Sequence, residues 1–237
     1  MGRNNWFEFK QFRIEQHKAA MKVGTDGVLL GAWTPVENAR RILDVGTGTG
    51  LIALMMAQRS VAYIDAVEID EHASEEAEFN FEQSEWNDRL RAYHTDFQVF
   101  ANEPHESYDL IVSNPPFFVN SLKTTNAASA IARHNDMLTF NQLITGAYKL
   151  LGKTGRLCII IPFSSCTEFR ECARLAGFYL QRQTVVIPKT GRIPKRVLME
   201  FCSEPCYPVY DELIVLDETG LFTGAYKKLT APFYPAF

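Results

Sequence analysis

The stretch RRILDVGTGTG at residues 40–50 decides the fold. Its apolar half reads as a short buried strand that ends near Asp44, and the helical run LIALMMAQRS follows at 51–60. Glycines between strand and helix let the turn tighten and let a ligand approach the main chain, while the helix N-terminus presents unpaired amides. The stretch therefore predicts a nucleotide-like cofactor at the end of a buried strand.

The glycine spacing and two further acids narrow the kind of cofactor. A dinucleotide fingerprint needs its third glycine at position 51, which is Leu51, so the pattern here is GxGxG. Glu68 and Asp96 close the next two predicted strands, where a carboxylate could accept from ribose hydroxyls or from an adenine amine. Each acid alone could equally be a turn or cap residue. Three carboxylates at three successive strand ends favour a binding site.

Outward from this stretch the chain alternates strand and helix patterns. We expect strands at 40–46, 63–70, 89–96, 108–114, 156–162, 184–188 and 196–201, and helices at 51–60, 71–84, 139–151 and 166–177. Continuous apolar strands between helices predict a doubly wound, mostly parallel α/β sheet covered on both faces, with ligands at the carboxyl ends of the strands. We predict an N-terminal arm over residues 1–35 that covers the cofactor and substrate, followed by one domain over 36–237.

A second motif, SNPPFF at 113–118, follows the buried run YDLIV. The Asn114 side-chain oxygen and the Pro115 carbonyl oxygen are two hydrogen-bond acceptors at the exit of this strand. The rings of Pro115 and Pro116 restrict φ and would keep that carbonyl rigid. Phe117, with Phe118 beside it, offers a face for base stacking, typically worth about 1–3 kcal/mol. The plainer alternative is a strand exit stiffened by prolines, with aromatics that enter the core.

Together these motifs resemble the class I S-adenosylmethionine-dependent methyltransferases over nearly the whole chain. The resemblance implies a Rossmann-like, mostly parallel seven-stranded sheet and S-adenosyl-L-methionine as cofactor. It implies that the methionine part lies over the loop of Asp44, Gly46, Gly48 and Gly50, the ribose at Glu68 and the adenine at Asp96. Amino-methyltransferases of this class carry (N/D)PP(F/Y) after the fourth strand, which implies catalytic roles for Asn114, Pro115, Pro116 and Phe117.

Three further stretches, FKQF at 9–12, KVGTDGVLLGAW at 22–33 and ARH at 132–134, are similar to bacterial tRNA1(Val) adenine-N6 methyltransferases. This resemblance implies methyl transfer to the N6 amine of adenine 37, beside the anticodon, with tRNA as partner. It also implies that one segment folds over the cofactor through Lys22, Gly24, Thr25 and Asp26. Near the substrate mouth it places Arg133 and His134. From the residues alone, TDG could instead be a helix N-cap and Arg133 a surface cation.

Other functions share the NPPF motif and stay open at this point. A guanine-N2 rRNA methyltransferase carries it, although such enzymes usually have an additional domain for which 237 residues leave little room. A protein-glutamine N5 methyltransferase is a second alternative, although NPPY is its common form. From a different class, the chain could be an RNA-binding module that keeps the fold without turnover. Binding of S-adenosylmethionine would argue against that module.

The distribution of charge favours a nucleic-acid partner more than the net charge of −4 does. The block from Asp65 to Asp109 holds fourteen of the 28 acidic residues and only two basic ones, so the rest of the chain has an excess of bases. A stretch without any acid carries Lys189, Arg192, Lys195 and Arg196. We expect these four side chains to bind RNA phosphates, although a solvated surface is the plainer alternative for any one of them.

Composition limits the environment in which we expect the protein. No apolar run is long enough to cross a bilayer, and the N-terminus lacks the apolar core of a signal peptide. Five cysteines without a CxxC pair indicate reduced thiols, and Cys202 and Cys206 lack the second pair that a zinc site would need. We therefore expect a cytoplasmic monomer with no metal and no membrane contact.

Overall fold

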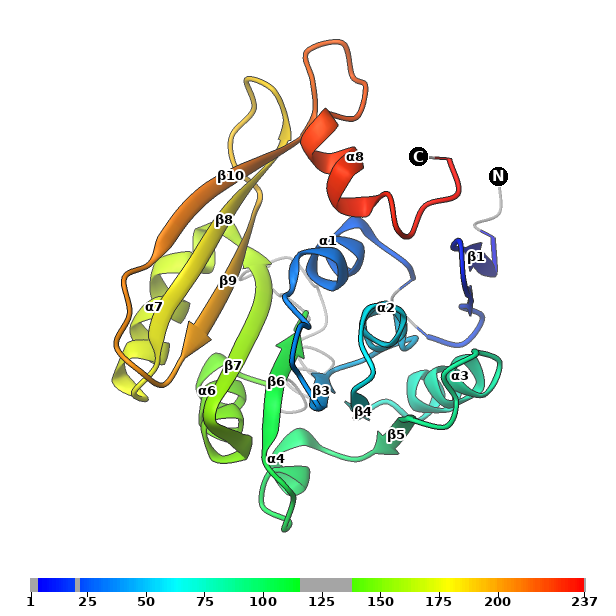
Figure 1. Cartoon of the computed structure of the whole chain (residues 1–237), viewed down its shortest axis with the longest axis vertical. Helices are drawn as coiled ribbons and strands as arrows, with labels where there is room; N and C mark the ends of the chain where they lie inside the picture. Colours follow the sequence, from blue (N-terminus) through cyan, green and yellow to red (C-terminus); the bar gives the residue numbers. More distant parts are fainter. Residues whose placement is uncertain (1–3, 20–21, 116–137, 237) are drawn as a thin grey trace, which may run out of the picture.

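The computed structural model describes residues 4–19, 22–115 and 138–236. Its centre is an eight-stranded sheet in the order β10-β8-β9-β7-β6-β3-β4-β5 (Figure 1). All neighbours pair in parallel except at β9, which runs antiparallel to both β7 and β8. The strands are β3 (Arg41–Val45), β4 (Tyr63–Glu68), β5 (Leu90–His94), β6 (Tyr108–Ser113), β7 (Leu151–Pro162), β8 (Tyr179–Lys189), β9 (Arg196–Cys202) and β10 (Val209–Leu216).

Helices cover both faces of this sheet, as the continuous apolar strands predict. One core cluster joins the sheet to α1 (Thr25–Trp33), α2 (Leu51–Arg59), α3 (Glu71–Glu82) and α8 (Gly224–Thr230). The other joins the opposite face to α4 (Phe97–Phe100), α6 (Phe140–Leu150) and α7 (Cys166–Leu175), which follows a 3-10 turn at Phe163–Ser165. Successive β3 residues alternate between the clusters, with Ile42 in the first and Leu43 in the second, as strand geometry requires. The predicted doubly wound, mostly parallel architecture is thus confirmed.

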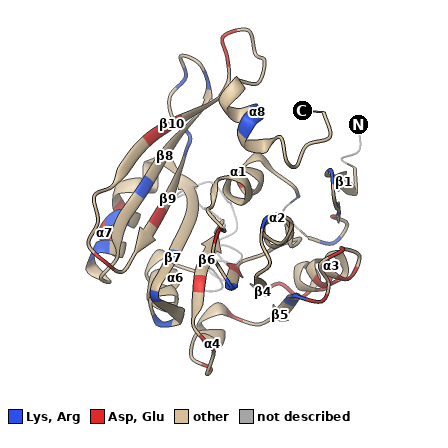
Figure 2. Cartoon of the chain, in the orientation of Figure 1, with Lys and Arg blue, Asp and Glu red and all other residues tan. Residues whose placement is uncertain are grey.

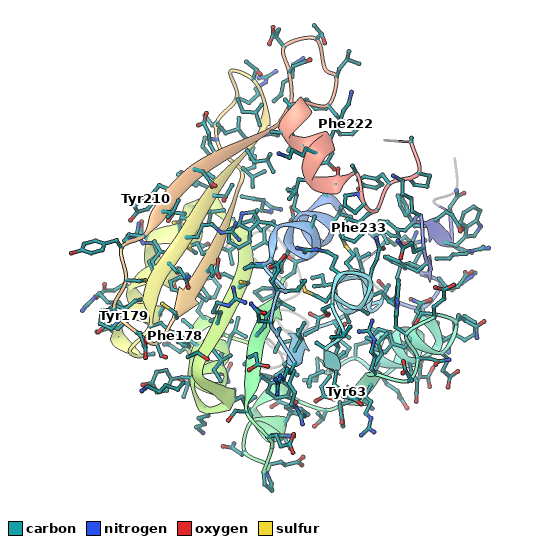
Figure 3. All side chains as sticks on the ribbon, in the orientation of Figure 1. Tyr63, Phe178, Tyr179, Tyr210, Phe222 and Phe233 are labelled. Atoms are coloured by element: carbon teal, nitrogen blue, oxygen red, sulfur yellow. The ribbon has the colours of Figure 1, made fainter. Side chains whose placement is uncertain are left out.

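The sheet has eight strands, whereas the sequence predicts seven. The additional strand is β10, which pairs in parallel with β8 at the edge of the sheet. Only Leu213 and Val215 of this strand are buried, and Tyr210 points away from the sheet (Figure 3). The first half of β10, residues 209–212, is exposed and includes two acids, so its apolar run is confined to residues 213–216 at the end of the strand.

The predicted helix at 139–151 and strand at 156–162 leave residues 152–155 as a connection, but β7 begins at Leu151 directly after α6. Tyr108 pairs with Leu151 but Leu110 pairs with Arg156, so the intervening residues form an irregularity in the strand. A side chain at Gly155 would meet the Tyr108 carbonyl oxygen at 2.9 Å. Glycine at this position therefore permits close strand pairing, where the sequence pattern left a connection.

The N-terminal and C-terminal segments pack together beside α1. A hairpin of β1 (Trp6–Glu8) and β2 (Arg13–Glu15) meets the C-terminal segment, where the Lys10 amide donates to the Phe233 carbonyl at 2.8 Å. Phe233 is fully buried in the cluster that contains α1 (Figure 3). Trp33 is the last residue of α1. The Arg182 guanidinium carbon lies 3.7 Å from the centroid of its ring, and its indole N–H donates to the Thr184 hydroxyl. These contacts fix the position of α1, whose N-terminus borders the site described below.

None of the helices within the described ranges combines the length and the apolar character that spanning a membrane requires.

Candidate functional site

Four parallel strands end at one edge of the sheet and bring the predicted site residues together. In register, Val45 of β3 pairs with Val67 of β4 and Ser113 of β6, while Glu68 pairs with His94 of β5. The residues that follow these ends line one cavity of about 230 Å³, and they include Gly46, Gly48, Glu68, Asp96, Asn114 and Pro115. Apart from the carboxylates, its walls are mostly apolar, with Val45, Val67, Ile69, Phe97 and Leu138. Carboxylates beside apolar walls suit a nucleoside.

A second cavity of about 430 Å³ adjoins the first and shares Gly46, Gly48, Asn114 and Pro115 with it. Its remaining walls come from the start of α1, the start of α2 and the start of β9, and include Lys22, Gly24, Thr25, Asp26 and Arg196. Asn114 and Pro115 therefore lie where the two cavities meet. This junction is where a reacting group held between two ligands would have to be.

The three glycines of the loop have different roles. Gly46 and Gly48 have φ of +73° and +57°, and a side chain on either would extend into open space. Gly50 also has positive φ, at +81°, but a side chain there would meet the Phe81 ring at 2.5 Å. Gly46 and Gly48 thus leave room for a ligand. Gly50 lines neither cavity; it caps α2, and its lack of a side chain lets the Phe81 ring pack against it.

Asp44 lies fully buried beneath this loop. Its Oδ2 atom accepts a hydrogen bond from the Thr47 hydroxyl at 2.6 Å, while Oδ1 completes no hydrogen bond within the described part of the chain. Burial raises the pKa of Asp44 to about 7, the nearby charge of Glu68 adds to the shift, and the Thr47 hydroxyl and the Ala53 amide oppose it. A buried carboxylate without a full set of partners is a feature that a bound cation or donor could complete.

Glu68 and Asp96 each accept hydrogen bonds from main-chain amides, and these bonds do not use all of their acceptor sites. Glu68 accepts from the Gly48 amide at 2.9 Å and from the amides of Ile69 and Asp70, which ties the glycine loop to the end of β4. Asp96 caps α4 by accepting from Gln98 and Val99 through Oδ1 alone. A carboxylate offers about four acceptor sites, so both groups retain some for a ligand in the cavity they line.

Ser113 ends β6 and its hydroxyl donates to the Val45 carbonyl at 2.8 Å, which joins the exit of β6 to that of β3. Asn114 is half-buried and Pro115 is buried at the cavity junction. The other residues predicted to contact substrate, Pro116, Phe117, Phe118, Arg133 and His134, lie outside the described residues.

The predicted RNA-binding cations separate into two places. Arg196 lines the second cavity, where its Nε atom donates to Asp26 Oδ2 at 2.6 Å, so it joins the start of β9 to the start of α1. Lys189 ends β8, and Arg192 and Lys195 lie in the turn between β8 and β9. Because β8 is parallel to β7, this turn emerges at the same edge of the sheet as the site. In Figure 2 the blue segments of this turn and of α8 lie apart from the red segments of α3.

Several lining residues were not predicted. Ala19 and Val23 come from the segment between β2 and α1, and Ala73 comes from α3. Val67, Ile69 and Phe97 adjoin the predicted acids in sequence, which is the signal by which they could have been found. Cys202 and Cys206 have their sulfurs 3.4 Å apart, and among the residues of known placement no three His, Cys, Asp or Glu side chains gather as metal ligands would.

The chemistry of these residues fits S-adenosylmethionine. The open space over Gly46 and Gly48 lies where the two cavities meet. The spare carboxylate oxygens of Glu68 and Asp96 face the apolar walls on which an adenine ring could rest. The same residues would accept from ribose hydroxyls and from the adenine amine.

Comparison with solved structures agrees with this class of fold. A predicted O-methyltransferase from Agrobacterium tumefaciens superposes with a TM-score of 0.67 at 20% identity, covering 88% of this chain and 96% of that one. A T. thermophilus 16S rRNA N2 G1207 methyltransferase in complex with AdoMet and guanosine gives 0.57 at 18% identity, covering 85% of this chain and 52% of that one. The fold is that of the class I S-adenosylmethionine-dependent methyltransferases.

Sequence comparison identifies the family. Residues 21–166 match the family described as methyltransferase small domain. A Bacteroides fragilis protein named tRNA1(Val) (adenine(37)-N6)-methyltransferase is 44% identical over 232 residues, covering 97% of each chain. A Flavobacterium psychrophilum protein of the same name is 46% identical over 230 residues, covering 96% of this chain and 98% of that one. The chain belongs to the tRNA1(Val) (adenine(37)-N6)-methyltransferase family.

The buried Asp44 carboxyl should make the stability of the free protein fall as the pH rises. Its folded-state pKa of about 7 lies above the ordinary 3.8, so the folded protein keeps a proton that the unfolded chain has released. The stabilising contribution is complete below about pH 4 and is lost as the pH rises through 7. Asp44→Asn should therefore raise the melting temperature at pH 8, with a much smaller effect at pH 5, and weaken binding of S-adenosylmethionine. A variant less stable than wild type at both pH values would contradict this assignment.

Proposed function

We propose that this chain transfers the methyl group of S-adenosylmethionine to the N6 amine of adenine 37 in tRNA1(Val). The observation that carries the proposal is the position of Asn114 and Pro115, directly after β6 and at the junction of the two cavities. The names of the close relatives supply the nucleotide and the tRNA. A tRNA substrate would place the enzyme in the cytoplasm.

Asn114 and Pro115 supply the acceptors that the reaction needs. An exocyclic adenine amine is a poor nucleophile because its lone pair is delocalised into the ring. The Asn114 side-chain oxygen and the Pro115 carbonyl oxygen would each accept a hydrogen bond from one amine N–H. These two hydrogen bonds would turn the nitrogen lone pair out of the ring plane. Acceptors fixed before the reaction begins stabilise the positive charge that develops on nitrogen without reorganising. No general base is assigned, since the nitrogen becomes acidic only after transfer and water can take its proton.

The two cavities would bind different parts of S-adenosylmethionine. When bound, S-adenosylmethionine would supply a sulfonium methyl group, which is an electrophile. We assign its nucleoside to the first cavity, with the ribose at Glu68 and the adenine at Asp96. Its methionine part would lie over Gly46 and Gly48 toward the second cavity, where the segment with Lys22, Gly24, Thr25 and Asp26 provides the opposite wall. We propose Phe117 and Phe118 for stacking and Arg133 and His134 for the substrate mouth.

The turn between β8 and β9 is well placed to bind the tRNA backbone. Lys189, Arg192 and Lys195 stand at the edge of the sheet that carries the site. Arg196 was predicted to share this role, but its ion pair with Asp26 at the second cavity gives its charge a partner within the chain. We therefore restrict the proposed phosphate contacts to the other three side chains.

Replacing the amide at the reacting centre should separate catalysis from cofactor binding. Asn114→Ala removes an acceptor that gains strength as charge develops, so we expect kcat to fall by about 100-fold or more. The dissociation constant for S-adenosylmethionine, measured by calorimetry, should stay within about threefold of wild type. Methyl incorporation into an unmodified tRNA1(Val) transcript provides kcat.

A transcript with guanine in place of adenine 37 is the matched control for substrate position, and wild-type enzyme should leave it unmethylated. Equal methylation of both transcripts would refute adenine 37 as the target. Equal loss of catalysis and of cofactor affinity in Asn114→Ala would mean that Asn114 belongs to cofactor binding and not to the reacting centre.

Neutralising the turn between β8 and β9 should weaken tRNA binding in a salt-dependent way. Each phosphate contact contributes about 0.7 to 0.9 to the slope of log K against log salt, so alanine at Lys189, Arg192 and Lys195 should reduce that slope by about 2 to 3. Fluorescence anisotropy with labelled tRNA over a salt series measures it. Lys153→Ala, at the opposite edge of the sheet near the start of β7, is the control. A slope unchanged in the triple variant would exclude this turn as the phosphate-binding surface.

A further inference from the structure

Helix α3 carries a buried carboxylate that the proposed reaction does not use. Glu76 is only 4% exposed. The acids on either side of it in sequence, Glu75 and Glu78, are exposed, whereas Glu76 is not. The cause is a segment that passes over the helix: the carboxylate accepts from the main-chain amides of His17, Lys18 and Ala19 at 2.5, 2.8 and 2.9 Å.

The three amides belong to the segment that links β2 to α1, and this segment forms a wall of both cavities. Ala19 lines the first cavity, and Lys22 and Val23 line the second. Gln16, itself 5% exposed, holds the other end, because its Oε1 atom accepts from the Val23 amide at 2.8 Å. Residues 17–19 and Val23 of this wall are thus held by buried side-chain acceptors on their main-chain amides.

The same face of α3 also holds the glycine loop. Asn80, one turn beyond Glu76, accepts from the Glu15 amide and donates to the carbonyls of Glu15 and Thr49, all at 2.9 Å. Ala73, three residues before Glu76, lines the first cavity. Residues at this spacing lie on one side of a helix. One face of α3 therefore joins the glycine loop, the N-terminal hairpin and the cavity wall.

We propose that Glu76 is a positioning residue for cofactor binding, which holds residues 17–19 so that Ala19, Lys22 and Val23 complete the cavity wall. Hydrogen bonds from amides to a carboxylate are stronger than those to a neutral acceptor. A neutral amide side chain would turn its own N–H groups toward one or more of the three donors and leave them poorly satisfied. The inference rests on the proposed function, because it takes the cavity to be the S-adenosylmethionine site.

Glu76→Gln tests the proposal, with Glu75→Gln as its matched control. Glu75 is the adjacent acid and makes exposed ion pairs with the side chains of Lys18 and His72, so the control changes the same charge without touching the three amides. In Glu76→Gln we expect the calorimetric dissociation constant for S-adenosylmethionine to rise about tenfold, with kcat at saturating cofactor within about twofold of wild type. The control should stay within about twofold for both.

The rate of proteolysis in residues 17–19 provides a second measurement. Trypsin should cleave after Lys18 several times faster in Glu76→Gln than in wild type or Glu75→Gln, and saturating S-adenosylmethionine should slow the cleavage. A loss of stability alone would lower the melting temperature without changing cofactor affinity well below it. An affinity within about twofold of wild type together with unchanged cleavage would overturn the proposal.

If Glu76→Gln does not fold, Glu76→Asp decides the matter, because it keeps the charge but shortens the reach to the amides. An intermediate loss of affinity supports the proposal, and an unchanged dissociation constant refutes it. The wild-type measurement separates the two levels of inference. Wild-type protein that binds no S-adenosylmethionine would refute the proposed function, whereas normal wild-type binding with an unaffected Glu76 variant would refute only the role of Glu76.

Discussion

The hydrogen bond from the Gly48 amide to the Glu68 carboxylate joins the two strand ends around which the site is built. The same carboxylate accepts from the amides of Ile69 and Asp70, so one side chain sets the path of the chain after both β3 and β4. With the loop held there, Gly46 and Gly48 present their open sides to the cavities. Ser113 then ties β6 to β3, which brings Asn114 to the junction.

One group of the loop costs the free protein stability. Asp44 is a fully buried carboxylate with one oxygen unpaired among the described residues. Residues that burden the folded state are typical of functional sites. The strands of the surrounding sheet are buried on both faces, and this burial offsets the cost.

The gathering of Gly46, Glu68, Asp96 and Asn114 at one cavity could be predicted from sequence because each lies at or just after the end of an apolar strand. In a parallel sheet such strand ends must meet at one edge, so strand detection alone places the residues near one another. The role of Gly50 could not be read in the same way, since its closeness to the Phe81 ring depends on how α3 packs against the start of α2.

Other features depend on chain crossings that periodicity does not encode. Glu76 reads as one more exposed acid until the segment from His17 to Ala19 is laid across α3. Arg196 reads as one of a group of surface cations until β9 brings it to Asp26, 170 residues earlier in the chain. In both cases the sequence identifies a charged residue, and only the tertiary structure identifies the group that neutralises or satisfies it.

The proposed reaction depends on two fixed acceptors, the Asn114 side-chain oxygen and the Pro115 carbonyl oxygen. They would hydrogen-bond both N–H groups of an adenine amine and orient its nitrogen for methylation. The most direct test is to incubate the protein with isotope-labelled S-adenosylmethionine and tRNA from cells lacking this activity, and to identify the labelled nucleoside and its position by mass spectrometry. The account predicts N6-methyladenosine at position 37 of tRNA1(Val). A label on a ring nitrogen, on a carbon, on guanine or on protein would contradict it.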